Sequence, residues 1–195
     1  ADFMAFSSHK MVGPSGVGML WGRENLLEEM PPFLGGGNMI SDVRTEGFTC
    51  AELPAKFEAG TQAIVEVVGL GAAVDYLSGI GMANVRAHEH EITVHALGAL
   101  RSRFGDDIVI HGSTDASVRG ATISFAYRDV HPHDVSQVLD QRNVCVRAGH
   151  HCAKPLMRLL GANATVRASF YLYNTPAEAD VLCDALAEAG DFFTL

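Results

Sequence analysis

The chain has 195 residues, 48% of them hydrophobic, and a net charge of -9 at pH 7. This length accommodates one domain or one and a half, with ample apolar content for a core. The acidic balance and the lack of a basic run exclude an electrostatic surface for nucleic acid, so a protein or small-molecule partner is expected.

The four cysteines, at positions 50, 145, 152 and 183, form no CxxC pair and no regular spacing. Neither a structural zinc site nor a disulfide scaffold is indicated, and free thiols are typical of a reducing compartment. The first residues show no signal-peptide pattern, and no apolar stretch approaches a membrane span. A cytoplasmic protein without membrane association is the expectation.

The first 80 residues are predicted to hold little regular structure before one long helix. Short apolar strands are expected at 3–7 and 17–21 around a Gly/Pro turn, as at the edge of a larger sheet. Residues 28–54 are rich in Gly, Pro and polar side chains, which favours loops with a hairpin. Helical spacing of apolar residues then runs from 61 to about 77, so the glycines at 69 and 71 belong to a helix and are no dinucleotide fingerprint.

The remainder alternates between helical and strand periodicity. The elements expected are helices at 87–104, 133–141 and 176–189 and strands at 108–111, 121–127, 144–147 and 166–172. Pro176 suits the first position of the last helix. This pattern predicts an α+β layer, in which helices cover a mostly antiparallel sheet.

A first candidate site surrounds Lys10, in the segment Phe6-Ser-Ser-His-Lys-Met11. On an extended segment Ser7 and His9 would point the same way and offer two donors to a phosphate beside the amine. A lysine among such donors suits an aldehyde cofactor that carries a phosphate, because a primary amine forms an imine. Taken alone, a lysine after a strand is more often a solvated surface residue.

A second candidate site surrounds Cys152, which follows Gly149, His150 and His151 in a predicted loop. Arg147 upstream and Lys154 downstream add positive charge, which favours a nucleophilic thiolate. The alternative is a structural cysteine. Cys50 and Cys183 are expected to be small hydrophobes or incidental, and so is Cys145, on the strand 144–147.

Both motifs resemble the class V aminotransferase family and, within it, the SufS-type (group II) cysteine desulfurases. The resemblance to the family extends to the segments 35–40, 57–61, 167–169 and 173–175. Members of the family are about twice as long, and this chain resembles their C-terminal half. The resemblance implies an α/β fold-type I pyridoxal phosphate (PLP)-dependent transferase. Residues 1–80 would end the PLP-binding large domain and include a connecting helix, and 81–195 would form the small α+β domain.

The resemblance also implies roles for the residues of the first part. Lys10 would hold pyridoxal 5'-phosphate as a Schiff base, with Ser7 and His9 on its phosphate. Thr61 would reach the partner subunit's phosphate in a homodimer, and the Gly35–Gly37 loop would also complete the neighbouring site. A plain helix N-cap at Thr61 remains the alternative.

In the second part, Cys152 would attack the sulfur of a bound L-cysteine and keep it as a persulfide while alanine is released. Arg167 would bind the α-carboxylate, a bidentate task that suits guanidinium. Arg147 would assist there or form a structural ion pair, and Asn174 is assigned to substrate binding by its motif. The sulfur would pass to an acceptor or scaffold protein of iron-sulfur cluster assembly.

Several alternatives stay open. The chain could belong to a selenocysteine lyase or a cysteine sulfinate desulfinase, or be a non-catalytic module that docks a sulfur acceptor. His133 is a hypothetical ligand to a partner's zinc, although helix polarity explains it almost as well. His88, His90 and His95 are expected to lie on a solvated helix face, so no metal of this chain's own is predicted.

Overall fold

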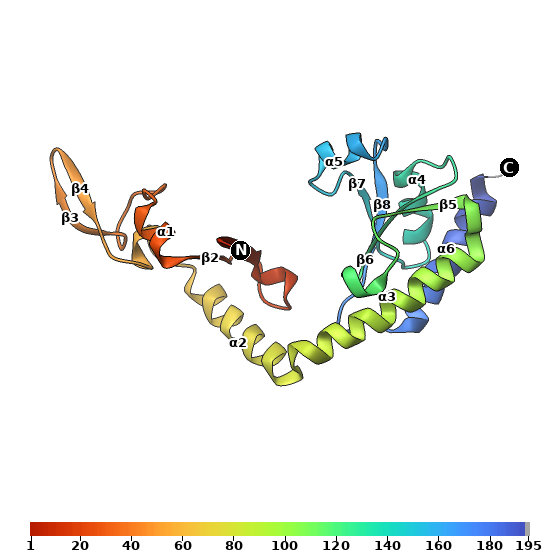
Figure 1. The fold of residues 1–195 in the computed structure, drawn as a ribbon, viewed down its shortest axis with the longest axis horizontal. Helices are drawn as coiled ribbons and strands as arrows, with labels where there is room; N and C mark the ends of the chain where they lie inside the picture. The colour runs from red at the N-terminus through yellow and green to blue at the C-terminus, as the bar shows by residue number, and fades with distance from the viewer. Residues whose placement is uncertain (194–195) are drawn as a thin grey trace. The chain divides into compact units, whose positions relative to one another are not determined.

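The computed structural model describes residues 1–193. They divide into two compact units that meet between Gly81 and Met82, whereas the sequence predicted a boundary between residues 80 and 81. Mixed helix and antiparallel sheet, as predicted, make up the fold (Figure 1).

The first unit begins with an antiparallel pair, β1 (Phe3–Ser7) and β2 (Gly18–Gly22), and both predicted strands are confirmed to within a residue. The segment after β1 is wrongly predicted as extended. It forms the 3-10 helix η1 (Ser8–Lys10), so the alternation argument for Ser7 and His9 fails. In a 3-10 helix, successive side chains are rotated by about a third of a turn, whereas in a strand they are rotated by about half a turn. Residues two apart therefore do not share a face in η1.

The middle of this unit is irregular apart from short elements. These are α1 (Glu24–Glu29), the hairpin of β3 (Ile40–Arg44) and β4 (Gly47–Cys50), and the 3-10 helix η2 (Ala55–Phe57). The hairpin confirms the prediction for 28–54, whereas α1 was not predicted. Six residues with no clear apolar stripe give a weak periodic signal.

The unit ends with α2 (Ile64–Ile80), whose N-cap is Ala63 and makes no side-chain cap. The prediction of Thr61 as the N-cap is therefore wrong, and Thr61 lies exposed in a bend before the helix. Gly69 faces Pro14, and a Cβ at Gly69 would lie 2.8 Å from the Pro14 ring. This close approach packs the helix onto the turn that follows η1.

The second unit is built on a four-stranded antiparallel sheet in the order β5-β6-β8-β7. Its strands are β5 (Ile108–His111), β6 (Thr122–Tyr127), β7 (Arg147–Gly149) and β8 (Thr165–Ser169). Alternate residues of β6, at 123, 125 and 127, are buried. This period of two gives the sheet one apolar face and one polar face.

Helices cover the apolar face (Figure 1). They are α3 (Met82–Phe104), α4 (Pro132–Asp140) and α6 (Pro176–Phe193), with the short α5 (Lys154–Leu159) after the β7 loop. The last helix begins at Pro176 as predicted, and Glu178 accepts a 2.6 Å bond from Thr175 N as in a capping box.

Several boundaries differ from the sequence prediction. The strand predicted at 166–172 ends at Ser169, and the helix predicted at 176–189 continues to Phe193. The helix predicted from 87 begins at Met82, directly after Gly81, whose φ of 86° ends α2. The strand predicted at 144–147 begins only at Arg147, because Val144 N still donates to Leu139 O in the turn after α4. Cys145 is therefore not on a strand.

Within residues 1–193, no single helix has the length and apolar content to cross a membrane. The segments Ile64–Ile80 and Met82–Asp107 meet that test of length and composition only when counted together as one broken span.

Candidate functional site

Cys152 lies exposed at the tip of a tight turn between β7 and α5. Ala153 N donates to His150 O at 2.9 Å, and the two residues between them have positive φ, 54° at His151 and 61° at Cys152. Two left-handed central residues are typical of a type I′ turn, which usually carries Asn, Asp or Gly. The turn presents the thiol of Cys152 at a strained backbone position.

Arg147 contacts this thiol directly. Its Nη2 donates to Cys152 Sγ at 3.6 Å, within the longer reach of a sulfur acceptor. The contact bears out the expected positive surroundings of Cys152. The alternative of a structural ion pair finds no support among residues 1–193, where no carboxylate pairs with Arg147.

A polar row crosses the sheet beside the turn. Arg147 lies opposite Arg167, Arg167 lies opposite Ser124, and Ser124 lies opposite His111. Residues paired in this way project from the same face, which here is the face that the helices leave uncovered. The row holds two guanidinium groups and no carboxylate.

Arg167 is half-buried, and its Nε is buried without a hydrogen-bond partner in the described part of the chain. No described carboxylate pairs with it. An unpaired guanidinium beside a second one is unfavourable in an empty site and favourable when an anion lies between them. The arrangement suits a carboxylate ligand within reach of the Cys152 turn.

His151 ties the turn to the sheet, and sequence reasoning had given it no role of its own. Its Nε2 is hydrogen-bonded to Thr165 Oγ1 at 2.8 Å, and Thr165 is fully buried. Burial lowers the pKa of His151 and the nearby Arg167 lowers it further. The ring is therefore held neutral at pH 7.

Lys10 ends η1 with its side chain exposed, in an open hollow of about 360 Å³ that Ser7 also lines. Ser8, also in η1, is fully buried, and its Oγ has no partner among residues 1–193. A Cβ at position 13 would fall 2.1 Å from that oxygen, so Gly13 is required for the turn. His9 is exposed beside Lys10. The amine and its polar neighbours are accessible to a ligand.

The remaining predicted residues have other surroundings. Asn174 uses its amide at the start of α6, where Oδ1 accepts from Tyr171 N and Nδ2 donates to Glu178. Its assignment to substrate stays a prediction. Of the other thiols, Cys145 is exposed, whereas Cys183 is buried and its burial raises the pKa to about 11.

The histidines of α3 form the expected solvated face only in part, because His95 is exposed but two of the three make contacts outside the helix. His88 Nε2 donates to Asn174 O at 2.9 Å, and His95 Nε2 to Asp180 at 2.8 Å, so both join α3 to the α6 region. His133 is exposed at the start of α4, with its ring stacked on that of His131. Within residues 1–193, no three potential metal ligands converge.

A family model described as aminotransferase class V matches residues 1–182. The chain belongs to this family. It is 55% identical over 193 residues to a Streptomyces coelicolor protein named "Probable cysteine desulfurase", covering 99% of this chain and 46% of the relative. It is 49% identical to "Cysteine desulfurase" of Haloferax volcanii, covering 99% and 45%.

Solved structures agree with this family assignment. The chain is similar to the cysteine desulfurase CsdA of Escherichia coli, with a TM-score of 0.89 and 37% identity over 98% of this chain and 46% of that one. The predicted fold class is thereby confirmed. The chain spans slightly less than half the length of the relatives that it matches.

Proposed function

We propose that the protein is a SufS-type cysteine desulfurase, which converts L-cysteine to L-alanine and supplies sulfur for iron-sulfur cluster assembly in the cytoplasm. The observation that carries the proposal is the contact of Arg147 with the exposed thiol of Cys152, next to the unpaired Arg167. The cysteine desulfurase relatives reported above support the same reaction.

The chemistry follows from the positions of these side chains. Arg167, with Arg147 opposite, binds the substrate α-carboxylate and so presents its sulfur to the turn. Cys152 Sγ forms an S–S bond to that sulfur while the substrate C–S bond breaks, and the released carbon gains a proton to become the methyl group of alanine. Arg147 Nη2, which contacts Cys152 Sγ, places positive charge beside the attacking sulfur.

The residues of the first unit fit pyridoxal 5'-phosphate. Lys10 offers an accessible primary amine beside Ser7, and Ser7 and His9 offer donors for a phosphate. The buried hydroxyl of Ser8 has no partner in the described residues, which agrees with a polar ligand near this segment. When bound, the cofactor would supply the electron sink for bond cleavage at the substrate carbons. Lys10 would hold it and move the α-proton.

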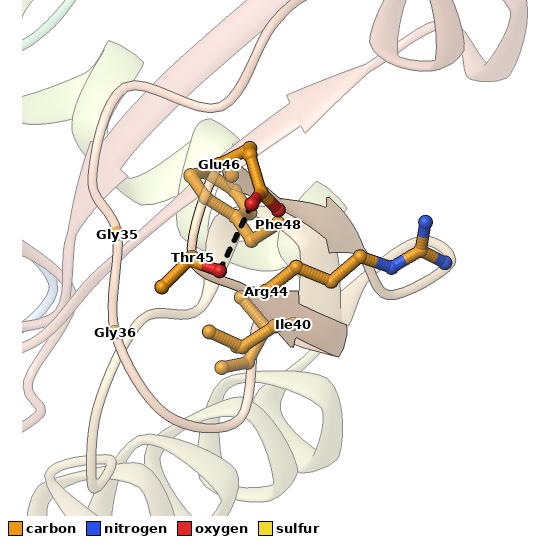
Figure 2. A pocket seen from close by; sticks show the side chains of 9 residues that line it. Gly35, Gly36, Ile40, Arg44, Thr45, Glu46 and Phe48 are labelled. Atoms are coloured by element: carbon orange, nitrogen blue, oxygen red, sulfur yellow. Dashed lines mark hydrogen bonds between the residues drawn. The ribbon is translucent and has the colours of Figure 1, made fainter.

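A homodimer is part of the proposal. The loop at Gly35 and Gly36 and the β3–β4 hairpin line a hollow of about 500 Å³ (Figure 2), and the guanidinium of Arg44 extends away from that loop. Phe33, at 71% exposed, and Phe48, at 51%, leave apolar surface on this part. Such surface fits a second subunit, which Thr61 would reach as the resemblance implies.

The persulfide sulfur would pass to an acceptor or scaffold protein. The exposure of Cys152 supports such a transfer, because a partner can approach the turn. His133 is a proposed ligand to a zinc ion of that partner, and its exposure at the start of α4 leaves the ring accessible. Unchanged acceptor-stimulated turnover in His133→Ala would remove this part of the proposal.

The first experiment tests cofactor and reaction together. The intact protein should contain bound pyridoxal, which borohydride reduction fixes on the Lys10 peptide, and should release alanine from L-cysteine. Lys10→Ala should lose the reduced adduct. A folded protein that binds no pyridoxal would instead support the non-catalytic docking module.

The second experiment separates the proposed reaction from its closest relatives. Alanine release from L-cysteine requires a thiol that accepts sulfur, so Cys152→Ala should abolish it. Substantial release from selenocysteine or cysteine sulfinate in Cys152→Ala, together with slow turnover of L-cysteine by the unaltered protein, would favour the selenocysteine lyase or sulfinate desulfinase alternative.

A further inference from the structure

The turn that carries Cys152 has a backbone that its own residues do not favour. His151 and Cys152 both adopt left-handed φ values, in consecutive positions where neither is glycine. An L-residue with a Cβ is strained there, and strain of this kind persists only where surrounding contacts hold it. Some contact outside the turn must therefore fix it.

The contact that meets this need is between His151 and Thr165. The 2.8 Å bond joins His151 Nε2, in the turn, to a fully buried hydroxyl on β8. Thr165 and Arg167 are two residues apart on the same strand, so they share its polar face. The His151 ring thus links the turn of Cys152 to the strand that carries Arg167.

We propose that His151 and Thr165 are positioning residues, whose hydrogen bond holds the turn left-handed and keeps Cys152 Sγ within reach of Arg147 Nη2. The inference deepens the proposed function and rests on its nucleophilic role for Cys152. It adds that the second histidine before the cysteine acts through geometry, by fixing the direction of the thiol.

The state of the ring agrees with this role. Burial, followed by the charge of Arg167, lowers the pKa of His151, so the imidazole at pH 7 is a neutral hydrogen-bonding group. Its Nδ1 is buried with no partner among residues 1–193. The cation that contacts the sulfur is Arg147, and the histidine serves only to place the sulfur beside it.

The test uses alkylation of the intact protein and needs no turnover. Cys152 and the exposed Cys145 are labelled with neutral iodoacetamide and with anionic iodoacetate, and both rates are followed by mass spectrometry. Guanidinium beside Cys152 Sγ attracts the anionic reagent, so the iodoacetate-to-iodoacetamide ratio should be higher at Cys152 than at Cys145. Cys145 is the internal reference in every variant.

Thr165→Val keeps the shape of the side chain and removes the hydroxyl. We expect the iodoacetate preference at Cys152 to fall by about tenfold, the size of one lost charge-assisted contact, to the level seen in Arg147→Gln. Thr165→Ser, which keeps the hydroxyl, should retain the preference. Circular dichroism checks that each variant is folded. A general loss of stability would change the labelling rates of Cys145 and Cys152 alike.

The outcomes separate the two hypotheses. If the unaltered protein shows no preference at Cys152 over Cys145, the cationic nucleophile of the proposed function is wrong. If that preference exists and folded Thr165→Val keeps it, the positioning role is wrong while the proposed function stands. If Thr165→Ser also loses it, the hydroxyl does not act and the inference is overturned.

Discussion

Arg167 is a half-buried cation that lies opposite Arg147 and forms no ion pair with a carboxylate in the described residues. We expect Arg167→Lys to lower kcat/KM for L-cysteine by about tenfold to a hundredfold, because an ammonium cannot make the bidentate contact that contributes about 1.5–3 kcal/mol. Steady-state alanine release measures this. Arg142→Lys, at a surface pair with Glu188, is the control, and an equal effect of both changes would contradict the role of Arg167.

Cys183 is buried, whereas Cys152 is exposed. Burial raises the pKa of the Cys183 thiol to about 11, and its side chain is almost inaccessible. At pH 8 it stays protonated, so iodoacetamide should modify Cys145 and Cys152 in the folded protein and leave Cys183 unmodified until urea unfolds the chain. Peptide mass mapping checks this, and early labelling of Cys183 would show that α6 opens easily.

The neutral His151 makes stability depend on pH. Its folded pKa is below the unfolded value of about 6.5, so the unfolded chain takes up more protons as the pH falls below 6.5. The free energy of unfolding should therefore decrease below that pH and be fully recovered above it. His151→Gln should flatten this part of the curve in urea titrations at pH 5.5 and 7.5. If the free energy of unfolding of His151→Gln fell with pH as much as that of the unaltered protein, this role of His151 would be contradicted.

Helix α2 offers a matched pair of glycines. Gly71 has open space around its Cβ position, so Gly71→Ala should stabilise the unit by about 0.5–1 kcal/mol through helix propensity. Gly69→Ala gains the same propensity but places a Cβ 2.8 Å from Pro14, and overpacking costs about 1–3 kcal/mol. Urea unfolding should show opposite signs. If Gly69→Ala were stabilising instead, the turn that carries Pro14 would have to move away from the added Cβ.

Regular elements were predictable where one period dominates. The alternation of Ile123, Phe125 and Tyr127 specified β6, and Pro176 marked the start of α6. The turns around the candidate site were not predictable, because nothing in His151 or Cys152 signals a left-handed backbone. The residues of the site were therefore inferred from the resemblance to the family. The geometry of the site depends on contacts between residues distant in sequence, such as His151 and Thr165, and could not be predicted.

The two units differ in how much core each contains. The large apolar cluster draws its buried members from residues 96–189, whereas the described buried hydrophobics of the first unit are Met39, Leu70, Ala73 and Leu77. Residues 82–195 alone should therefore unfold cooperatively, with a stability of about 5 kcal/mol. Residues 1–81 alone should not. Calorimetry of both segments tests this, and a sharp transition in 1–81 would contradict it.

Much of the apolar surface of α2 lies outside that small core. Val65 is 79% exposed and Val68 is 70% exposed. From sequence, Val68 counted toward the helical periodicity, and nothing in the pattern distinguished a buried valine from an exposed one. The relatives that the chain matches are about twice its length. The periodicity of α2 therefore predicts a helix but does not predict which of its valines are buried.

The two arginines that face each other across β7 and β8 have a thermodynamic consequence for the molecule as a whole. Like charges opposite one another on adjacent strands oppose folding, and a bound oxyanion relieves that repulsion only in the native state. Sulfate should therefore raise the melting temperature more than chloride at equal ionic strength, and Arg147→Gln should diminish the difference. The protein would therefore resist heat best when an oxyanion lies between these two side chains.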